Sequence, residues 1–356
     1  MKPDDRNGAR PPAERPFRVL VIAGSDRRQY DCPGVDSKAR ALALRVARAM
    51  PDDWEVDLED LANITFRARI QSCNACVSTS MALCVWPCNC YERGSRLEPD
   101  LMWDLDLYAR LDLADAWVIV GPVNWYAPSS NLKLMFDRLV CMNGGNPRED
   151  LIGHKDPERA MALERSPAWE ALSRNHLEGR TAAFFCYGDG GGDELDDEGR
   201  PKALRHPAWF DPAREPFDDM RDAYAPLAWQ CRYSGVEVPD ALWRYVEFGR
   251  GEPYSANQAE HLVARPAVLD AVDDFSAAVV DHVRAKGKVT PGPYRAYGYE
   301  PPGHLLADLK TGARNLRLRL GLAPKGSSPA AQQRLGLNDD EQLLPERGEV
   351  RRSRTD

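Results

Sequence analysis

The sequence lacks the features that mark several classes of protein. No stretch approaches the about 18 consecutive apolar residues of a membrane-spanning helix, and residues 1–16 contain no apolar segment of a secretory signal. Basic residues are not in excess, since the formal net charge is -8. Because a phosphate backbone is bound by a basic surface, we expect no nucleic-acid partner. Together these absences predict a cytoplasmic protein.

Well-known catalytic motifs are absent too. The chain contains neither the GxxxxGK[ST] phosphate loop nor the GxGxxG dinucleotide motif, and no Ser/His/Asp arrangement follows from the spacing. The six histidines are scattered, and none lies in the cysteine-rich segment 73–90. We expect His154, His176 and His206 to lie at the surface. Nothing in these residues predicts a hydrolase.

Hydrophobic residues make up 43% of the 356 residues, enough for a large core, and the fold class follows from their pattern. Short β-branched runs alternate with segments of helical spacing, which predicts a parallel sheet between two layers of helices. We therefore expect an α/β three-layer sandwich with a five-stranded parallel sheet. The expected strands are 18–25, 54–58, 116–121, 180–187 and 235–238. The expected helices are 38–50, 100–114, 130–140, 220–232 and 267–286.

Several segments lie outside this plan. We expect a disordered leader at 1–16, one domain at 17–290 with an acidic, proline-rich insertion at about 195–219, a helical extension at 291–324 and a disordered tail at 325–356. Within the extension, leucines at helical spacing stand among basic residues. Such a helix either docks on the core or binds an anionic surface or partner.

Three polar loops follow expected strands, at 24–38, 122–130 and 187–193. Ligands of open α/β sheets bind at the carboxyl edge of the strands, where such loops meet. The first loop supplies hydroxyl groups and cations just before a helix, whose exposed N–H groups favour an anion such as phosphate. Its candidate residues are Ser25, Arg27, Arg28, Ser37 and Lys38.

The second loop holds a proline, an amide and two adjacent aromatic side chains, Trp125 and Tyr126. Such a loop can place backbone amides and an aromatic wall beside a flat, hydrogen-bonding ring. The alternative is a surface turn whose Trp125 folds onto the core. The third loop, after Tyr187, is rich in glycine, which lets the backbone approach a ligand closely or simply makes a flexible turn.

These motifs together resemble the flavodoxin-like NAD(P)H-dependent FMN reductase family, over roughly residues 18–286. The resemblance implies FMN at the carboxyl edge of the sheet, NADPH or NADH as co-substrate, and a homodimer. The residues that carry it are Val21–Ser25 with Ser37 and Lys38, Gly121–Trp125 with Leu132, Lys133 and Phe136–Arg138, and the glycine-rich turn after Phe184 and Phe185.

Carried over by position, the resemblance assigns three groups of FMN-binding residues and no catalytic side chain. The first loop departs from the compact family pattern because residues 29–36 lengthen it. Ser25, Arg27, Ser37 and Lys38 would hold the phosphate; Pro122, Val123, Asn124 and Trp125 the ribityl chain and ring; and Tyr187, Gly188 and Gly190 the pyrimidine edge of the ring.

Five of the nine cysteines crowd into one segment, at positions 73, 76, 84, 88 and 90. The related iron–sulfur flavoproteins place the ligands of a four-iron cluster here, but Thr79 stands where their third ligand is expected. A zinc site would lack the usual pair of CxxC motifs. We expect reduced thiols without a bound metal, with an iron–sulfur cluster or zinc as alternatives.

The resulting hypothesis is an FMN-dependent NAD(P)H oxidoreductase that passes electrons to a small acceptor such as a quinone or flavin. The flavin carries the chemistry, so the protein needs only to bind and orient it. Two alternatives remain, an FMN electron carrier that uses no nicotinamide and a cofactor-free interaction module. The sequence decides neither the acceptor nor the choice between NADH and NADPH.

Overall fold

The fold is taken from a computed structural model. It describes residues 15–27, 36–62, 69–84, 88, 90–91, 100–140, 156–173, 175–189, 197–198, 221–248 and 258–291. The predicted leader up to residue 14, the acidic insertion except residues 197–198, and the extension and tail beyond residue 291 lie outside these residues.

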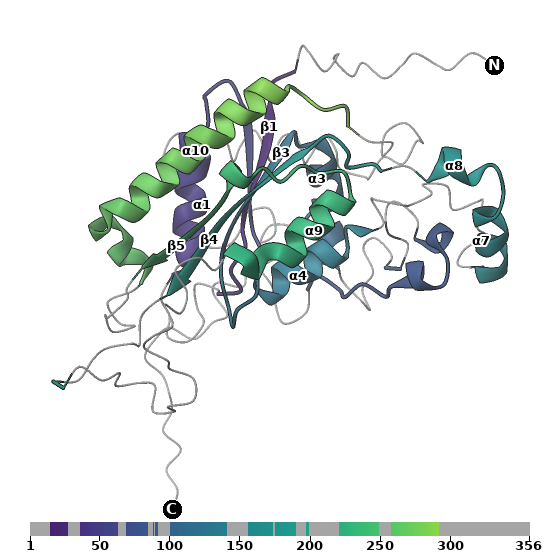
Figure 1. The fold of residues 1–356 in the computed structure, drawn as a ribbon, viewed down its shortest axis with the longest axis horizontal. Helices are drawn as coiled ribbons and strands as arrows, with labels where there is room; N and C mark the ends of the chain where they lie inside the picture. Colours follow the sequence, from purple (N-terminus) through teal and green to yellow (C-terminus); the bar gives the residue numbers. More distant parts are fainter. Residues whose placement is uncertain are drawn as a thin grey trace, which may run out of the picture.

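The centre of the molecule is a five-stranded sheet in which all neighbouring strands are parallel (Figure 1). The strand order β2-β1-β3-β4-β5 is that of flavodoxin-like folds, so the predicted fold class is confirmed. The strands are β1 Arg18–Ala23, β2 Glu55–Asp60, β3 Ala116–Pro122, β4 Thr181–Asp189 and β5 Trp243–Phe248.

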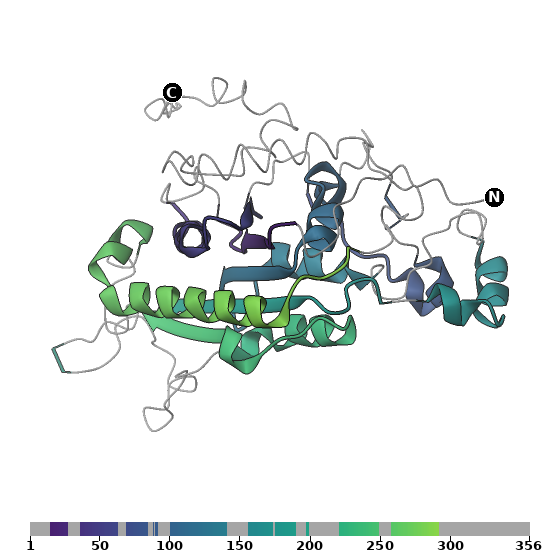
Figure 2. The ribbon, with the colours of Figure 1, turned by 90° about the horizontal axis from the view of Figure 1, so that it is seen from above.

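Helices cover both faces of the sheet (Figures 1 and 2). Alternate residues of β1 enter different cores, with Val19 and Val21 on one face and Leu20 and Ile22 on the other. The first face carries α1 Lys38–Ala49 and α10 Pro266–Lys286. The second carries α2 Leu101–Asp104, α3 Leu107–Leu113, α4 Ser130–Asp137 and α9 Ala225–Tyr233.

A small group of short helices lies beside the second face, set apart from the sheet in both views (Figures 1 and 2). It consists of the 3₁₀ helices η1 Cys76–Ser78 and η2 Met81–Leu83 with α7 Pro157–Glu164 and α8 Trp169–Leu172. The remaining 3₁₀ helices are η3 Arg221–Tyr224, η4 Asp240–Leu242 and η6 Ala259–Ala264. None of the helices in the described ranges is long and apolar enough to cross a membrane.

Three sequence-based expectations differ from the structure. The predicted fifth strand at 235–238 makes only a single bridge, between Glu237 and Thr181, and the strand proper is β5. The predicted helix at 100–114 is broken in two at Asp106, whose φ of 48° is left-handed. His176, expected at the surface, is buried at 8% exposure, and the buried Arg180 donates to its carbonyl oxygen. His154 and His206 lie outside the described residues.

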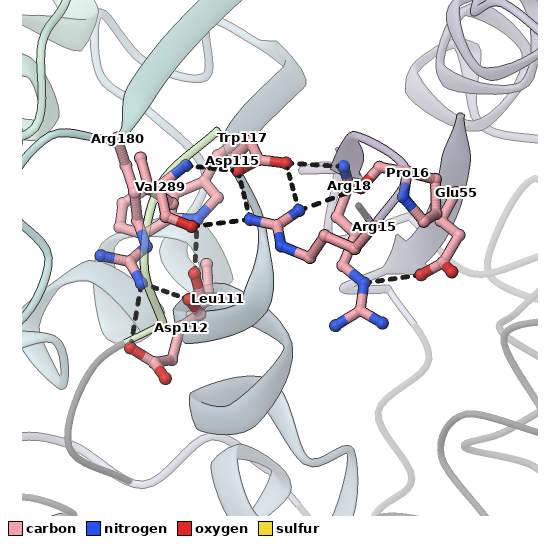
Figure 3. Close-up of polar contacts among 10 residues, drawn as sticks. All are labelled: Arg15, Pro16, Arg18, Glu55, Leu111, Asp112, Asp115, Trp117, Arg180 and Val289. Carbon is pink, nitrogen blue, oxygen red and sulfur yellow. Dashed lines mark hydrogen bonds and ion pairs between the residues drawn. The ribbon is translucent and has the colours of Figure 1, made fainter. Parts of the chain in front are cut away.

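At the amino edge of the sheet, one carboxylate joins both ends of the described chain (Figure 3). The guanidinium of Arg15 pairs with both oxygens of Asp115, at 2.6 and 2.7 Å. The backbone N–H groups of Arg18 and Val289 each donate to the same carboxylate at 2.8 Å. Arg15, which the sequence analysis assigned to the leader, is therefore buried in the folded domain.

Candidate functional site

The loops after β1 and β3 are joined at the carboxyl edge of the sheet by direct contacts. The Ser129 hydroxyl, just before α4, donates to the carbonyl oxygen of Gly24. A side chain at position 24 would collide with Leu132 of α4, since an added Cβ would lie 2.4 Å from its Cδ1 atom. The two loops therefore lie in direct contact, as predicted from the order of the strands.

The first loop turns tightly behind β1. Ser25 is buried, and its hydroxyl accepts a hydrogen bond from the backbone N–H of Arg27 at 3.1 Å. The Arg27 residue itself is exposed. Between them, Asp26 turns its carboxylate to α4, where it accepts hydrogen bonds from the backbone N–H groups of Ser130 at 3.0 Å and Asn131 at 3.1 Å.

Burial raises the pKa of the Asp26 carboxyl, while the hydrogen bonds from Asn131 and Ser130 act in the opposite direction. Together with the Ser129 hydroxyl, which accepts from the Leu132 N–H at 3.4 Å, this carboxylate satisfies the N-terminus of α4. The amino end of α4 is therefore already occupied by groups of the protein itself.

The amino end of α1 differs in that respect. Ser37 stands at the N-cap position but makes no side-chain capping hydrogen bond, although serine is a favoured cap. Its side chain is 1% exposed, and its buried hydroxyl has no hydrogen-bond partner within the described ranges. A buried hydroxyl without a partner is costly, so this one is suited to a bound ligand. Lys38 follows, partly buried, at the first helical position.

Arg40 fixes the start of α1 against the sheet. Its guanidinium is buried, pairs with Asp60 at the end of β2 at 2.6 Å, and also pairs with Asp36. A further N–H of Arg40 donates to the carbonyl oxygen of Arg27 at 3.3 Å. The exposed N–H groups of α1 are therefore held at the carboxyl edge beside the first loop.

The second loop forms a tight two-residue turn after β3. Asn124 and Ala127 exchange backbone hydrogen bonds of 2.8 and 3.1 Å, which leaves Trp125 and Tyr126 at the tip. Their φ angles are 50° and 63°, in the left-handed region that glycine or asparagine usually fills in such turns. Trp125 is 95% exposed and Tyr126 57%. The alternative that Trp125 packs on the core is therefore wrong.

Trp125, in the left-handed region and 95% exposed, buries almost no apolar surface that would offset its strained backbone. The turn is held from below, because Val123 donates to the carbonyl oxygen of Tyr187 at 2.8 Å and the buried Tyr224 hydroxyl donates to that of Pro122 at 2.9 Å. The backbone beneath the two rings is therefore fixed, as a binding surface for a flat ligand requires.

The residues at the end of β4 are less accessible to a ligand than those of the second loop. The Tyr187 side chain is 3% exposed and packs in the core beside α1 and α10. Gly188 lies against Tyr245 so closely that an added Cβ would come within 2.1 Å of its hydroxyl oxygen. Gly190 lies outside the described residues. A contribution of this turn to binding stays a prediction.

Sequence reasoning missed three residues that shape this site, namely Asp26, Arg40 and Tyr224. Arg40 pairs with Asp36, four positions before it, and this helical spacing was a signal that could have been used. Asp26 and Tyr224 act on partners 104 and 102 positions away, which no local pattern reveals.

The cysteine segment lies apart from this edge. The Sγ atoms of Cys76 and Cys90 are 3.6 Å apart, and Cys84 and Cys88 are buried nearby. Across the parts of the chain that the structure describes, no group of three or more His, Cys, Asp or Glu side chains is placed to hold a metal ion.

Comparison with known proteins supports the resemblance found in the motifs. Residues 17–155 match the model of a family described as NADPH-dependent FMN reductase. This segment contains β1, α1, β2, β3 and α4, and hence both loops that the structure joins. The resemblance to this family is thereby confirmed over that part of the chain. No curated protein matches the sequence.

Three solved structures illustrate the similarity of fold. An NAD(P)H:quinone oxidoreductase from Methanothermobacter marburgensis is 13% identical, with a TM-score of 0.39 over 73% of this chain and 96% of that one. An FMN-dependent NADH-azoreductase from Bacillus anthracis, in complex with FMN, is 12% identical, with a TM-score of 0.33 over 74% and 99%. A WrbA-like flavodoxin from Agrobacterium tumefaciens is 10% identical, with a TM-score of 0.33 over 76% and 99%. With TM-scores below 0.5, these similarities support no conclusion about activity.

Proposed function

We propose that this chain, whose residues 17–155 match the NADPH-dependent FMN reductase family, is an FMN-dependent NAD(P)H oxidoreductase that reduces a small flat acceptor. The observation that carries the proposal is the amino end of α1, where the buried Ser37 hydroxyl has no partner in the described chain. The residues around it fit the phosphate of FMN.

The fit to a phosphate follows from charge and hydrogen-bonding capacity. The first N–H groups of α1 carry a partial positive charge, and the Ser37 hydroxyl can donate to a phosphate oxygen. Arg27 and Lys38 add two cations on either side of the serine. Two carboxylates lie in the described part of the first loop. Asp26 is turned to α4. Asp36 accepts a hydrogen bond from the Ser37 backbone N–H at 2.8 Å, and the Arg40 guanidinium pairs with it.

The ring of the flavin requires a fixed backbone and a flat apolar contact. Pro122, Val123 and Asn124 supply the backbone, since two of them are pinned to Tyr187 and Tyr224 and the third closes the turn. Trp125 supplies an exposed aromatic surface beside it. We assign these four residues to the ribityl chain and ring, and Gly188 and Gly190 to the ring edge.

When bound, FMN supplies the hydride chemistry, accepting two electrons from the nicotinamide and passing them to a second substrate. The protein's residues bind and orient: Ser37, Arg27 and Lys38 fix the phosphate, and the turn at 124–127 limits what can stack against the ring. An exposed aromatic turn selects for planarity and not for a particular substituent. A quinone or a free flavin meets that requirement.

A single-turnover experiment tests the proposal. The FMN-loaded protein is mixed anaerobically with excess NADPH or NADH, and the visible flavin absorption is followed in a stopped-flow instrument. Rapid bleaching, followed by its recovery on addition of a quinone, is the expected result. Flavin that binds but is not bleached by either nicotinamide would identify an electron carrier instead.

Two further measurements separate the remaining alternatives. A protein that stays colourless after titration with FMN would be a cofactor-free interaction module, and the proposal would fail. The family resemblance also implies a homodimer, which light scattering coupled to size-exclusion chromatography measures directly. A dimer that forms only in the presence of FMN would link assembly to the cofactor.

A further inference from the structure

Two half-buried thiols at opposite ends of one loop lie in contact. The Sγ atoms of Cys76 and Cys90 are 3.6 Å apart, and 14 positions separate the two residues in the sequence. Both side chains are only partly covered, so small reagents can reach them. Neither thiol belongs to the proposed flavin site, and the proposed activity does not use them.

Cys76 belongs to the group of short helices beside the second face. It begins η1, and its thiol also lies 3.8 Å from the carbonyl oxygen of Leu83 in η2. The next helix is tied to α7, because the Glu164 carboxylate accepts hydrogen bonds from the Ser80 hydroxyl and, at 3.1 Å, from the Met81 N–H. Cys76 therefore moves with η1, η2 and α7 as one unit.

Cys90 is attached to the main core instead. Its neighbour Tyr91 accepts a hydrogen bond on its carbonyl oxygen from the Trp103 indole at 2.8 Å, and the Arg138 guanidinium lies 4.6 Å from its ring centroid. The Tyr91 hydroxyl donates to the carbonyl oxygen of Ser72 at 2.8 Å. The contact between the two thiols thus bridges the small helical unit and the core.

We propose that Cys76 and Cys90 form a reversible disulfide, made by exchange with a small disulfide such as oxidised glutathione. Cys84 and Cys88 lie beside them, since Cys84 is hydrogen-bonded to Cys76 and Cys88 to Cys90. Within the described ranges this group is not placed to hold a metal ion, so we assign the bond to the pair whose Sγ atoms are in contact at 3.6 Å. Intracellular disulfides of this kind are usually transient, catalytic or redox-sensing.

The exchange balances in atoms and electrons. One protein thiolate attacks a sulfur of oxidised glutathione, which breaks its S–S bond and releases one glutathione thiolate. The second protein thiolate then attacks the protein sulfur of the mixed disulfide and releases the other. The two protons lost by the cysteines are taken up by the two glutathione thiolates. The net change is oxidation of two protein thiols and reduction of one glutathione disulfide.

The bond would change the mechanics of the segment. In the reduced protein the helical unit is held by hydrogen bonds and by the packing of Ala82 and Leu83 on Ala160. In the oxidised protein a covalent link would join Cys76 to Cys90, whose neighbour Tyr91 is bound to Trp103 and Arg138 of the main core. Oxidation should therefore slow backbone hydrogen exchange across η1, η2 and α7, and leave the sheet unaffected.

The test uses the full-length chain in anaerobic glutathione buffers of graded redox potential, with a chelator present. Acid quenching and alkylation of free thiols come first. Trypsin then releases residues 70–93, which contain all five cysteines of the segment, and cyanogen bromide cuts this peptide after Met81. A disulfide between Cys76 and Cys90 keeps the two pieces joined, and tandem mass spectrometry assigns the linked sulfurs.

We expect the joined peptide to accumulate with rising potential and to disappear on addition of dithiothreitol. The Cys73→Ser variant, the matched control, should form it unchanged, whereas Cys76→Ser should lose it. If circular dichroism shows that either variant misfolds, the fragmentation spectrum of the wild-type peptide alone identifies the linked cysteines. A link through Cys73, Cys84 or Cys88, glutathione adducts without an internal link, or a metal that shields these thiols from alkylation despite the chelator would overturn the proposal.

Discussion

The carboxylate of Asp26 accepts a hydrogen bond of 3.1 Å from the backbone N–H of Asn131, and so fastens the loop after β1 to the first turn of α4. The same Asn131 donates from its side-chain amide to the carbonyl oxygen of Leu61, next to the end of β2, at 2.9 Å. Three segments of the carboxyl edge are thus joined through one residue pair. The Asp26 carboxylate therefore occupies the amino end of α4, whereas the amino end of α1 has no side-chain cap.

The raised pKa of Asp26 gives a pH dependence with a definite sign. Burial, the largest cause, favours the protonated Asp26 carboxyl in the folded protein. The contribution of this protonation to the stability of the fold is fully present below the ordinary pKa of 3.8. It is lost as the pH rises through the raised pKa. The melting temperature of the wild type, relative to Asp26→Asn, should therefore fall over the range just above pH 3.8. Parallel melting curves at several pH values measure this, and a difference that rises instead would contradict the sign.

Replacement of Ser37 by alanine should weaken FMN binding through the phosphate alone. A hydrogen bond to a charged group contributes about 1.5–3 kcal/mol, which corresponds to roughly 10- to 100-fold in affinity. Riboflavin, which has no phosphate, should bind both proteins equally. Fluorescence titration with the two ligands measures the effect. Ser276→Ala is the matched control, since that buried hydroxyl donates to its own helix at Val272 and lies in α10. Equal losses for both ligands would remove Ser37 from the phosphate site.

Trp125→Gly should separate folding from function. A non-glycine residue in the left-handed region costs about 1–2 kcal/mol, and this side chain is 95% exposed, so its removal sacrifices no core packing. Without flavin, we expect the free energy of unfolding to stay the same or rise by up to about 1 kcal/mol. The increase in melting temperature caused by excess FMN should shrink. Trp229→Ala, at another exposed tryptophan, should leave both quantities unchanged.

The ion pair between Arg15 and Asp115 should contribute far more to stability than an exposed one. Asp115→Ala would leave a buried guanidinium without its carboxylate, which costs about 3–5 kcal/mol. In the control, Asp273→Ala removes the partner of Arg45 from an exposed pair and should cost less than about 1 kcal/mol. Urea unfolding of the two variants measures both losses. A small effect of Asp115→Ala would mean that the amino edge holds together without it.

The thiol of Cys76 should react slowly at neutral pH. Its hydrogen bond to Cys84, the largest cause, raises its pKa to about 11, so little thiolate exists at pH 7. Alkylation by iodoacetamide, followed by peptide mapping, should speed up about tenfold per pH unit until that pKa is approached. Cys84→Ala removes the main cause and should raise the rate at a fixed pH. An unchanged rate in that variant would mean that another group controls Cys76.

Much of the fold could be predicted because its strands are short, apolar and bounded by glycine or polar residues. β1 and β3 are nearly all buried, and their continuous apolar runs are typical of strands covered on both faces by helices. The fifth strand was misplaced because Glu237 and β5 both pair with β4, and local patterning cannot tell a single bridge from a ladder. The break at Asp106 was missed because a single left-handed residue leaves the helical spacing of its neighbours intact.

The candidate site could be predicted in outline but not in detail. The loops were found because parallel strands bring their carboxyl ends to one edge. The conformation of Trp125 could not be found, since sequence favours glycine or asparagine wherever φ is positive, and two aromatic residues there contradict that rule. The burial of Tyr187 followed from the register of β4 beside β3 and β5, which is a property of the whole sheet.

The contact of Arg15 with the carbonyl oxygen of Val289, at 2.7 Å, brings the two ends of the described chain together on the amino side of the sheet. That side lies opposite the carboxyl edge, where the loops after β1 and β3 meet. A short linker could therefore join the two described ends, and new termini could be opened elsewhere, without altering the loops of the proposed flavin site. Circular permutation that joins residue 15 to residue 289 is thus open to this fold.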